Sequence, residues 1–378
     1  MKGQRVRSAI QGLFIGLSGV LLVACGETEQ GVPEMSERER QNIEAYTRTM
    51  RPVCIGRFQV GMPQQLALRH SSLKVNNAEI SARPTSRAMF ESFIRERKEA
   101  LEATEPLDDQ NLPFLKEVHK PDTDMVIMDR NNDRHTPDSA RILEGYRWDG
   151  GTMFKVQLEA IDVDSERYRD QRQFRTTNKF DRLKQVKHLL NHLQPRRAGD
   201  IPEGPGLCLE GGFLVGEAEE PIPGAALQVR EETVAMTFVD RQYSDVYIHF
   251  NANSTVSTED TLLDRMGQAE AAMRARGDEN FAVLRRGKVE LEGIEQAEEW
   301  LGVLTTDARI RGNFFTLEAN SQRGNTREPR ISMTFKNGEY SLIEEDRPRL
   351  DRASLTDAEA VGLWDAITRT FRTRPGAF

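Results

Sequence analysis

Three cysteines are the side chains of this 378-residue chain whose type and spacing best support specific chemistry. Cys25 closes an apolar run that begins at Leu13, and a basic segment with Lys2 and two arginines precedes that run. An apolar core this short cannot cross a hydrocarbon layer of ~30 Å, which needs about 20 residues, so the pattern is typical of a cleaved export signal. The small residue before Cys25 resembles a bacterial lipobox, after which the cysteine sulfur carries a diacylglycerol.

We therefore predict a signal peptide over residues 1–24 and a lipidated N-terminus at Cys25. An ordinary secretory signal and an uncleaved anchor are the alternatives. The prediction places the mature chain in the periplasm, attached to a membrane. Because Gly26 rather than Asp follows the cysteine, the sequence favours the outer over the inner membrane.

The other two cysteines, Cys54 and Cys208, form an even pair in an oxidising compartment. A disulfide between them would close a loop of about 155 residues and restrict the unfolded chain by roughly 4–5 kcal/mol. Two separately buried thiols, each packing as a small apolar side chain, are the alternative. We favour the disulfide, which would join the start of one half of the chain to the start of the other.

Other candidates for chemistry are weaker. His188 and His192 lie four residues apart on an expected helix, but the segment lacks the glutamate of HExxH and no third ligand is evident. Residues 129–133 begin like a calcium loop and then lack its glycine and final glutamate, so we interpret them as a polar turn. Glu290 and Glu292 alternate as a glycosidase pair might, although charged strand edges show the same pattern.

Motifs of nucleophile elbows, phosphate-binding loops and dinucleotide-binding loops do not occur in the expected mature chain. The sequence thus argues against an enzyme, and we expect no catalytic residue, no metal and no cofactor. The formal net charge of -8 disfavours binding to nucleic acid or to anionic lipid. We expect a monomer, because no coiled-coil pattern is evident.

Hydrophobic periodicity predicts an α+β protein of two similar domains, each with an antiparallel sheet packed by helices. The expected order is a lipidated tether over 25–48, an N-terminal domain over 49–200 and a C-terminal domain over 201–378, joined by the Gly- and Pro-rich linker 198–206. Both halves run strand, hairpin, helix, strand, hairpin, helix, an order that either a duplication or recurrent α+β patterning alone would produce. The expected elements are strands at 51–63 and 206–216, hairpins at 66–83 and 141–163, helices at 86–102, 176–194, 259–275 and 356–371, and a short helix near 294–300.

Four short motifs carry a resemblance to a known family: CIGRF at 54–58, GLCLEGGF at 206–213, FFTLE at 314–318 and RISMTF at 330–335. Together they resemble the type VI secretion immunity proteins that neutralise phospholipase effectors in the periplasm. The resemblance implies a two-domain inhibitor that grips a phospholipase toxin and occludes the entrance to its active site. An envelope scaffold lipoprotein and a divergent hydrolase are the rival interpretations. The acidic segment 217–220 could contact a partner, but we favour its interpretation as a solvated loop.

Overall fold

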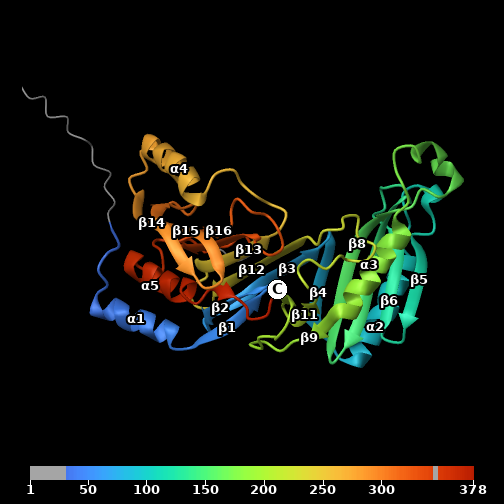
Figure 1. Ribbon diagram of the computed structural model, residues 1–378, viewed down its shortest axis with the longest axis horizontal. Coiled ribbons are helices and arrows are strands. Elements are labelled where there is room, and N and C mark those ends of the chain that lie inside the picture. The colour runs from blue at the N-terminus through green and yellow to red at the C-terminus, as the bar shows by residue number, and fades with distance from the viewer. Residues whose placement is uncertain (1–30, 344–347) are drawn as a thin grey trace, which may run out of the picture.

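The computed structural model describes residues 31–343 and 348–378, which form two lobes along one long axis (Figure 1). A sheet of twelve antiparallel strands runs through both lobes in the order β14-β15-β16-β17-β13-β12-β3-β4-β8-β7-β6-β5. The first half of the chain contributes β1 (Met50–Ile55), β2 (Phe58–Pro63), β3 (Leu66–Val75), β4 (Ala78–Pro84), α2 (Arg87–Glu102), β5 (Leu115–Asp122), β6 (Met125–Asn131), β7 (Ala140–Asp149), β8 (Thr152–Ile161), α3 (Lys179–His192) and β9 (Leu193–Pro195). The second half contributes β10 (Gly206–Leu209), β11 (Gly212–Val215), β12 (Glu232–Asp240), β13 (Val246–Asn253), α4 (Leu262–Arg276), β14 (Ala282–Leu291), β15 (Ile294–Thr305), β16 (Arg311–Ala319), β17 (Arg330–Asn337), α5 (Asp357–Thr368) and β18 (Arg372–Thr373).

The order of elements is the same in the two halves. Each half has two hairpins, a helix, four strands, a second helix and a short final strand. The sheet order is also symmetric about the pairing of β3 with β12, since β4-β8-β7-β6-β5 on one side matches β13-β17-β16-β15-β14 on the other. The predicted α+β class, with antiparallel sheets in two similar halves, is therefore confirmed.

The two halves exchange their first hairpins. The β1–β2 hairpin, which opens the first half, pairs with β18 from the end of the second half. The β10–β11 hairpin, which opens the second half, pairs with β9 from the end of the first half. The division of the molecule in space therefore differs from the division of the sequence.

We define the N-lobe as β4 to β8 with α2 and α3, and the C-lobe as β12 to β18 with α4, α5 and the first-half strands β1 to β3. Strand β3 belongs with the C-lobe because it pairs with β12 along its whole length, from Leu66 to Val75. The junction sheet, formed by β9, β10 and β11, lies between the lobes (Figure 1).

Turn residues account for two places where a predicted strand is a hairpin. Residues 51–63 and 206–216, each expected as one strand, fold back at Gly56 and Gly211. These glycines have φ values of 56° and 71°, a backbone conformation that residues with a Cβ atom rarely adopt. The hairpin predicted to turn at Asn76-Asn77 is confirmed, and both asparagines have positive φ.

The short helix expected near residues 294–300 is wrong, because this segment is part of strand β15. Its Glu, Gln and Ala residues favour helices in isolation, but β15 is paired on both sides, with β14 and with β16. Burial between two strands outweighs a propensity of less than about 1 kcal/mol per residue. Strand β5, an edge strand with few apolar residues, was not predicted from the sequence.

Part of the segment expected as a tether is a docked helix. Helix α1 (Glu37–Thr47) begins at Ser36, whose side chain forms a capping box with Glu39. Its buried residue Ile43 and the neighbouring Met35 lie against Gly362 of α5, where the lack of a side chain permits close approach. Helix α1 is therefore part of the C-lobe. No helix of the described residues is long and apolar enough to span a bilayer.

A buried carboxylate joins α2 to the N-lobe sheet. Glu144 of β7 is fully buried and accepts hydrogen bonds from Arg97 of α2, from Arg130 of β6 and from the hydroxyl of Tyr146. Burial alone would raise the pKa of Glu144, but the two guanidinium groups outweigh it and lower this pKa to about 2. The carboxylate is thus charged in the folded protein over most of the pH range.

We expect Glu144 to make the stability of the protein pH-dependent. A folded-state pKa of about 2, against an ordinary value of 4.5, stabilises the protein above pH 4.5, and this contribution is lost as the pH falls towards 2. It amounts to about 3 kcal/mol at neutral pH. Glu144→Gln should therefore lower the free energy of unfolding in urea by about that much at neutral pH and flatten its pH dependence in this range. Glu79→Gln, which removes a solvent-exposed ion pair with Lys74, should change neither.

Candidate functional site

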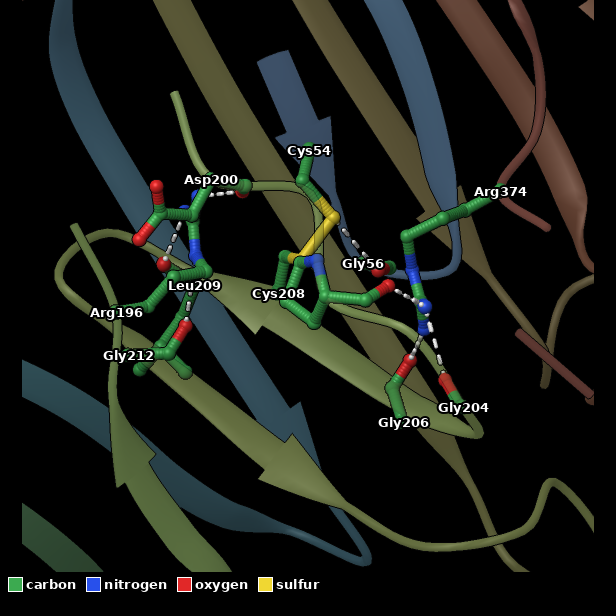
Figure 2. The surroundings of a disulfide bond; sticks show 11 residues. Cys54, Gly56, Arg196, Asp200, Gly204, Gly206, Cys208, Leu209, Gly212 and Arg374 are labelled. Atoms are coloured by element: carbon green, nitrogen blue, oxygen red, sulfur yellow. Dashed lines mark hydrogen bonds between the residues drawn. A yellow bond between two sulfur atoms is a disulfide. The ribbon is translucent and has the colours of Figure 1, made fainter. Parts of the chain in front are cut away.

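The junction between the lobes is built around a disulfide (Figure 2). Cys54 of β1 and Cys208 of β10 are bonded with Cα atoms 5.7 Å apart, and both are buried. The backbones of Gly56 and Cys208 also exchange two hydrogen bonds, of 3.0 and 2.9 Å. The pairing favoured from the sequence is therefore present, and it joins the two hairpins that the halves exchange.

Three buried charges lie beside this bridge. The Arg57 guanidinium donates two hydrogen bonds to the Glu232 carboxylate, of 2.8 and 2.7 Å, and Arg230 donates a third. Arg57 also donates to the carbonyl of Ala377 and packs over the ring of Phe378 at 5.3 Å. Burial lowers the pKa of Arg230, while Glu232 opposes that effect. One carboxylate thus balances two buried guanidinium groups, and one of these, Arg57, binds the C-terminal residues Ala377 and Phe378.

The linker between the halves is bound by the C-terminal segment. Arg374 donates hydrogen bonds to the carbonyls of Pro202, Gly204 and Gly206, and the last two are visible in Figure 2. The guanidinium also lies over the ring of Phe213 at 5.2 Å. The Gly- and Pro-rich linker is therefore an ordered part of the junction.

Removing the carboxylate of this cluster should be strongly destabilising. We expect Glu232→Gln to lower the free energy of unfolding by about 3–5 kcal/mol, because it leaves two buried guanidinium charges without a counterion. Urea denaturation of the disulfide-bonded protein measures this loss. Glu231→Gln is the matched control, since the hydrogen bonds of Glu231 that we describe are made by its backbone. Equal stability of the two variants would contradict the role assigned to Glu232.

The other residues considered from the sequence lie in different parts of the described chain and do not come together in one cluster. His188 and His192 stack on α3 with ring centroids 4.0 Å apart, and Nδ1 of His192 bonds to the carbonyl of His188. Among residues 31–343 and 348–378, no three His, Cys, Asp or Glu side chains are grouped so as to hold a metal ion. Glu292 lies in the exposed turn after β14 and pairs with Arg372 at 3.3 Å, so it does not share a strand with Glu290.

The segment expected as a polar turn over 129–133 is in part a strand, because β6 continues to Asn131. Asp129 is buried there, and burial raises its pKa. The nearest cationic groups, on Arg141 and Lys179, lie 3.7 Å from its two oxygens, beyond hydrogen-bond distance. Asp133 caps the following turn by accepting hydrogen bonds from the backbone of His135 and Thr136.

The acidic segment 217–220, considered above as a partner contact, lies in the described part of the chain. Glu219, in the acidic segment 217–220, forms an exposed ion pair with Arg327 at 2.6 Å. This pairing ties the segment to another surface loop and is consistent with a solvated loop. The expected signal peptide and Cys25 lie outside the described residues.

The structure also shows an exposed apolar surface that the sequence did not indicate. We call residues 106–112 and 163–180 of the first half the tip surface. It carries Phe174, which is 83% exposed, Phe180, which is 58% exposed, and the exposed Leu107 and Leu112. Arg167 joins its two segments by hydrogen bonds to the carbonyl of Gln110 and the side chain of Asn111.

A hollow of about 390 Å³ lies beside Phe180 and is lined by Arg172 and Arg175. Exposed aromatic and arginine side chains are the types that contribute most to protein interfaces. No sequence signal separates Phe174 and Phe180 from buried phenylalanines, because only the tertiary structure decides which aromatic side chains stay outside.

Two family models together match most of the chain. A model of the Tle cognate immunity protein 4 N-terminal domain matches residues 51–196, and the corresponding C-terminal domain model matches residues 200–376. No curated protein sequence matches the chain.

Solved structures with a similar fold include proteins described as immunity proteins. The Tle4–Tli4 complex contains a chain with 18% identity and a TM-score of 0.66, covering 88% of this chain and 99% of its own. The apo immunity protein TplEi of the type VI secretion system of Pseudomonas aeruginosa has 16% identity and a TM-score of 0.65, covering 87% of this chain and 98% of its own. TplEi bound to an "L" peptide has 16% identity and a TM-score of 0.62, with coverage of 87% and 99%.

The two domain models together match nearly all residues from 51 to 376, so the resemblance expected from the short motifs is confirmed. The chain belongs to the family of Tle cognate immunity protein 4.

Proposed function

We propose that this protein binds a phospholipase effector of the type VI secretion system in the periplasm and inhibits it by occluding the entrance to its active site. The observation that carries the proposal is the match of both domain models of an effector-cognate immunity protein to this chain. A structural relative is described as part of a Tle4–Tli4 complex, which supports a protein partner for this fold. The protein would act by binding, without turnover of a substrate.

The tip surface is the part of the described chain best suited to contact the lipase. It combines the exposed Phe174 and Phe180 with the arginine-lined hollow, so a partner can bury aromatic area and form charge-assisted hydrogen bonds in one place. A stable inhibitory interface buries at least about 1,200 Å² in total. The tip surface would supply the central contacts of such an interface.

The direct test uses the lipase encoded beside the gene of this protein. The disulfide-bonded body should inhibit its hydrolysis of phospholipid at nanomolar concentration. Phe174→Ala together with Phe180→Ala should weaken inhibition at least about tenfold, because truncating a central hot-spot residue of an interface costs at least about 2 kcal/mol and about 1.4 kcal/mol is tenfold in affinity.

Met89→Ala is the matched control, because Met89 is also an exposed apolar residue of the N-lobe and lies on α2 near its N-terminus. Full inhibition by the Phe174/Phe180 double variant would remove the tip surface from the interface. Absence of inhibition by the wild-type body, with an active lipase, would contradict the proposed function itself.

We also propose that the protein is anchored to the outer membrane through a lipid on Cys25. Cys25 lies ten positions before Met35, which packs on α5, and a chain of that length spans at most about 35 Å. An anchor there would keep the C-lobe close to the membrane on which a phospholipase acts.

Cys25→Ser should therefore release the protein into the soluble periplasmic fraction, which cell fractionation followed by immunoblotting detects. Because Cys54 and Cys208 form the internal disulfide, the substitution should leave the folded body unchanged. Unchanged membrane association of the Cys25→Ser variant would rule out acylation as the anchor.

A further inference from the structure

The symmetry between the two halves is broken at one hairpin. In the second half, β12 and β13 pair over seven residue pairs. In the first half, the equivalent strands β3 and β4 pair over three, from Leu73–Ile80 to Val75–Ala78. Before Leu73, β3 continues along β12, and after Ile80, β4 continues along β8. The two strands therefore separate like a fork, and the lobes meet at its closed end.

The closed end of the fork is held firmly. Asn76 is buried in the turn, and its side chain donates to the carbonyl of Val229 and accepts from the backbone of Glu231. Its own backbone N–H donates to Glu231, and its carbonyl accepts from the buried Gln185 of α3. These bonds fix the position of the turn. Because these hydrogen bonds lie at the β3–β4 turn itself, the N-lobe can rotate about the turn without breaking them.

The junction sheet supports the fork at a distance from its closed end. Gly212 of β11 packs against Phe154 and Ala82 of the N-lobe. Ala82 lies four residues beyond Ala78 on β4, which corresponds to about 13 Å along the strand. A support at that distance sets the angle between the lobes, because a small shift of the junction sheet turns the N-lobe about the β3–β4 turn.

The other side of the junction sheet is covalently fixed to the C-lobe. Cys208 of β10 is bonded to Cys54 of β1, and β1 belongs to a hairpin that pairs with β18. The hydrogen bonds of Gly56 and Arg374 reinforce this attachment but can be broken and re-formed with thermal motion. The disulfide is the one covalent crosslink between the hairpins that open the two halves.

We propose that the Cys54–Cys208 disulfide fixes the angle between the two lobes by securing the junction sheet in the β3–β4 fork. Without the bond, each lobe keeps its fold and the N-lobe moves about the Asn76-Asn77 turn. The lobe geometry presented to any partner then depends on oxidation of the chain after export. This inference rests on the geometry of the lobes and does not depend on the proposed function.

The test measures distances between the lobes in the absence of a partner. Spin labels are attached to ketone-bearing residues placed at Met89 in the N-lobe and Gln268 in the C-lobe, both exposed, so that no new cysteine is needed. Double electron–electron resonance spectroscopy should give a narrow distribution of the distance between the two labels in the oxidised protein. Cys54→Ser with Cys208→Ser should give a roughly twofold wider distribution, as expected for a released hinge. An unchanged width would overturn the proposal.

A label pair within the C-lobe, at Arg38 and Gln268, is the control and should stay narrow in every variant. If the cysteine variant unfolds and both pairs broaden, Gly212→Val decides the question. That variant keeps the disulfide but forces the junction sheet away from Phe154 and Ala82. The proposal predicts broadening of the inter-lobe pair alone, whereas a narrow distribution would show that the junction sheet does not set the angle.

Discussion

The bond between Cys54 and Cys208 joins two hairpins that have each left their own half of the chain and docked on the other. Because of this exchange, neither half is complete alone: β2 needs β18, and β11 needs β9. The buried charges of Arg57, Arg230 and Glu232 lie at the same place, so the junction combines a covalent bond with a desolvated ionic cluster. Cooperative folding of the two lobes follows from this arrangement, since opening the junction exposes groups from both.

The exchange also explains how one continuous sheet can serve two lobes. A twisted open sheet of more than about ten strands normally curls, splits or flattens. Here the layer divides at the β3–β4 fork, and the junction sheet fills the space that the fork opens. The N-lobe carries the tip surface at its end remote from α1, so a rigid junction keeps the tip surface at a fixed position relative to the C-lobe (Figure 1). An inhibitor that contacts a lipase over a large area gains affinity from such preorganisation.

Much of this fold follows from local sequence signals, and the rest depends on contacts between distant residues. The Asn76-Asn77 turn, the helix capped by Thr356 and the repeated order of elements could be predicted from turn chemistry and periodicity. Strand β15 could not, because its pairing with β14 and β16 overrides a helix-favouring composition. The pairing of Cys54 with Cys208 could be predicted, because these two cysteines remain once Cys25 is assigned to the lipid anchor. The exposure of Phe174 is a tertiary property that the spacing of residues does not reveal. The hairpin exchange was likewise invisible, since either hairpin satisfies its own backbone hydrogen bonds locally.

Membership in an effector-cognate immunity family, two lobes held rigidly together and an exposed aromatic tip describe a protein built to bind another protein. The measurement that tests this account most directly is calorimetric titration of the disulfide-bonded body with the lipase encoded beside its gene. The account predicts a one-to-one complex with a nanomolar dissociation constant, corresponding to about -12 kcal/mol. No detectable binding to a folded, active lipase would contradict it.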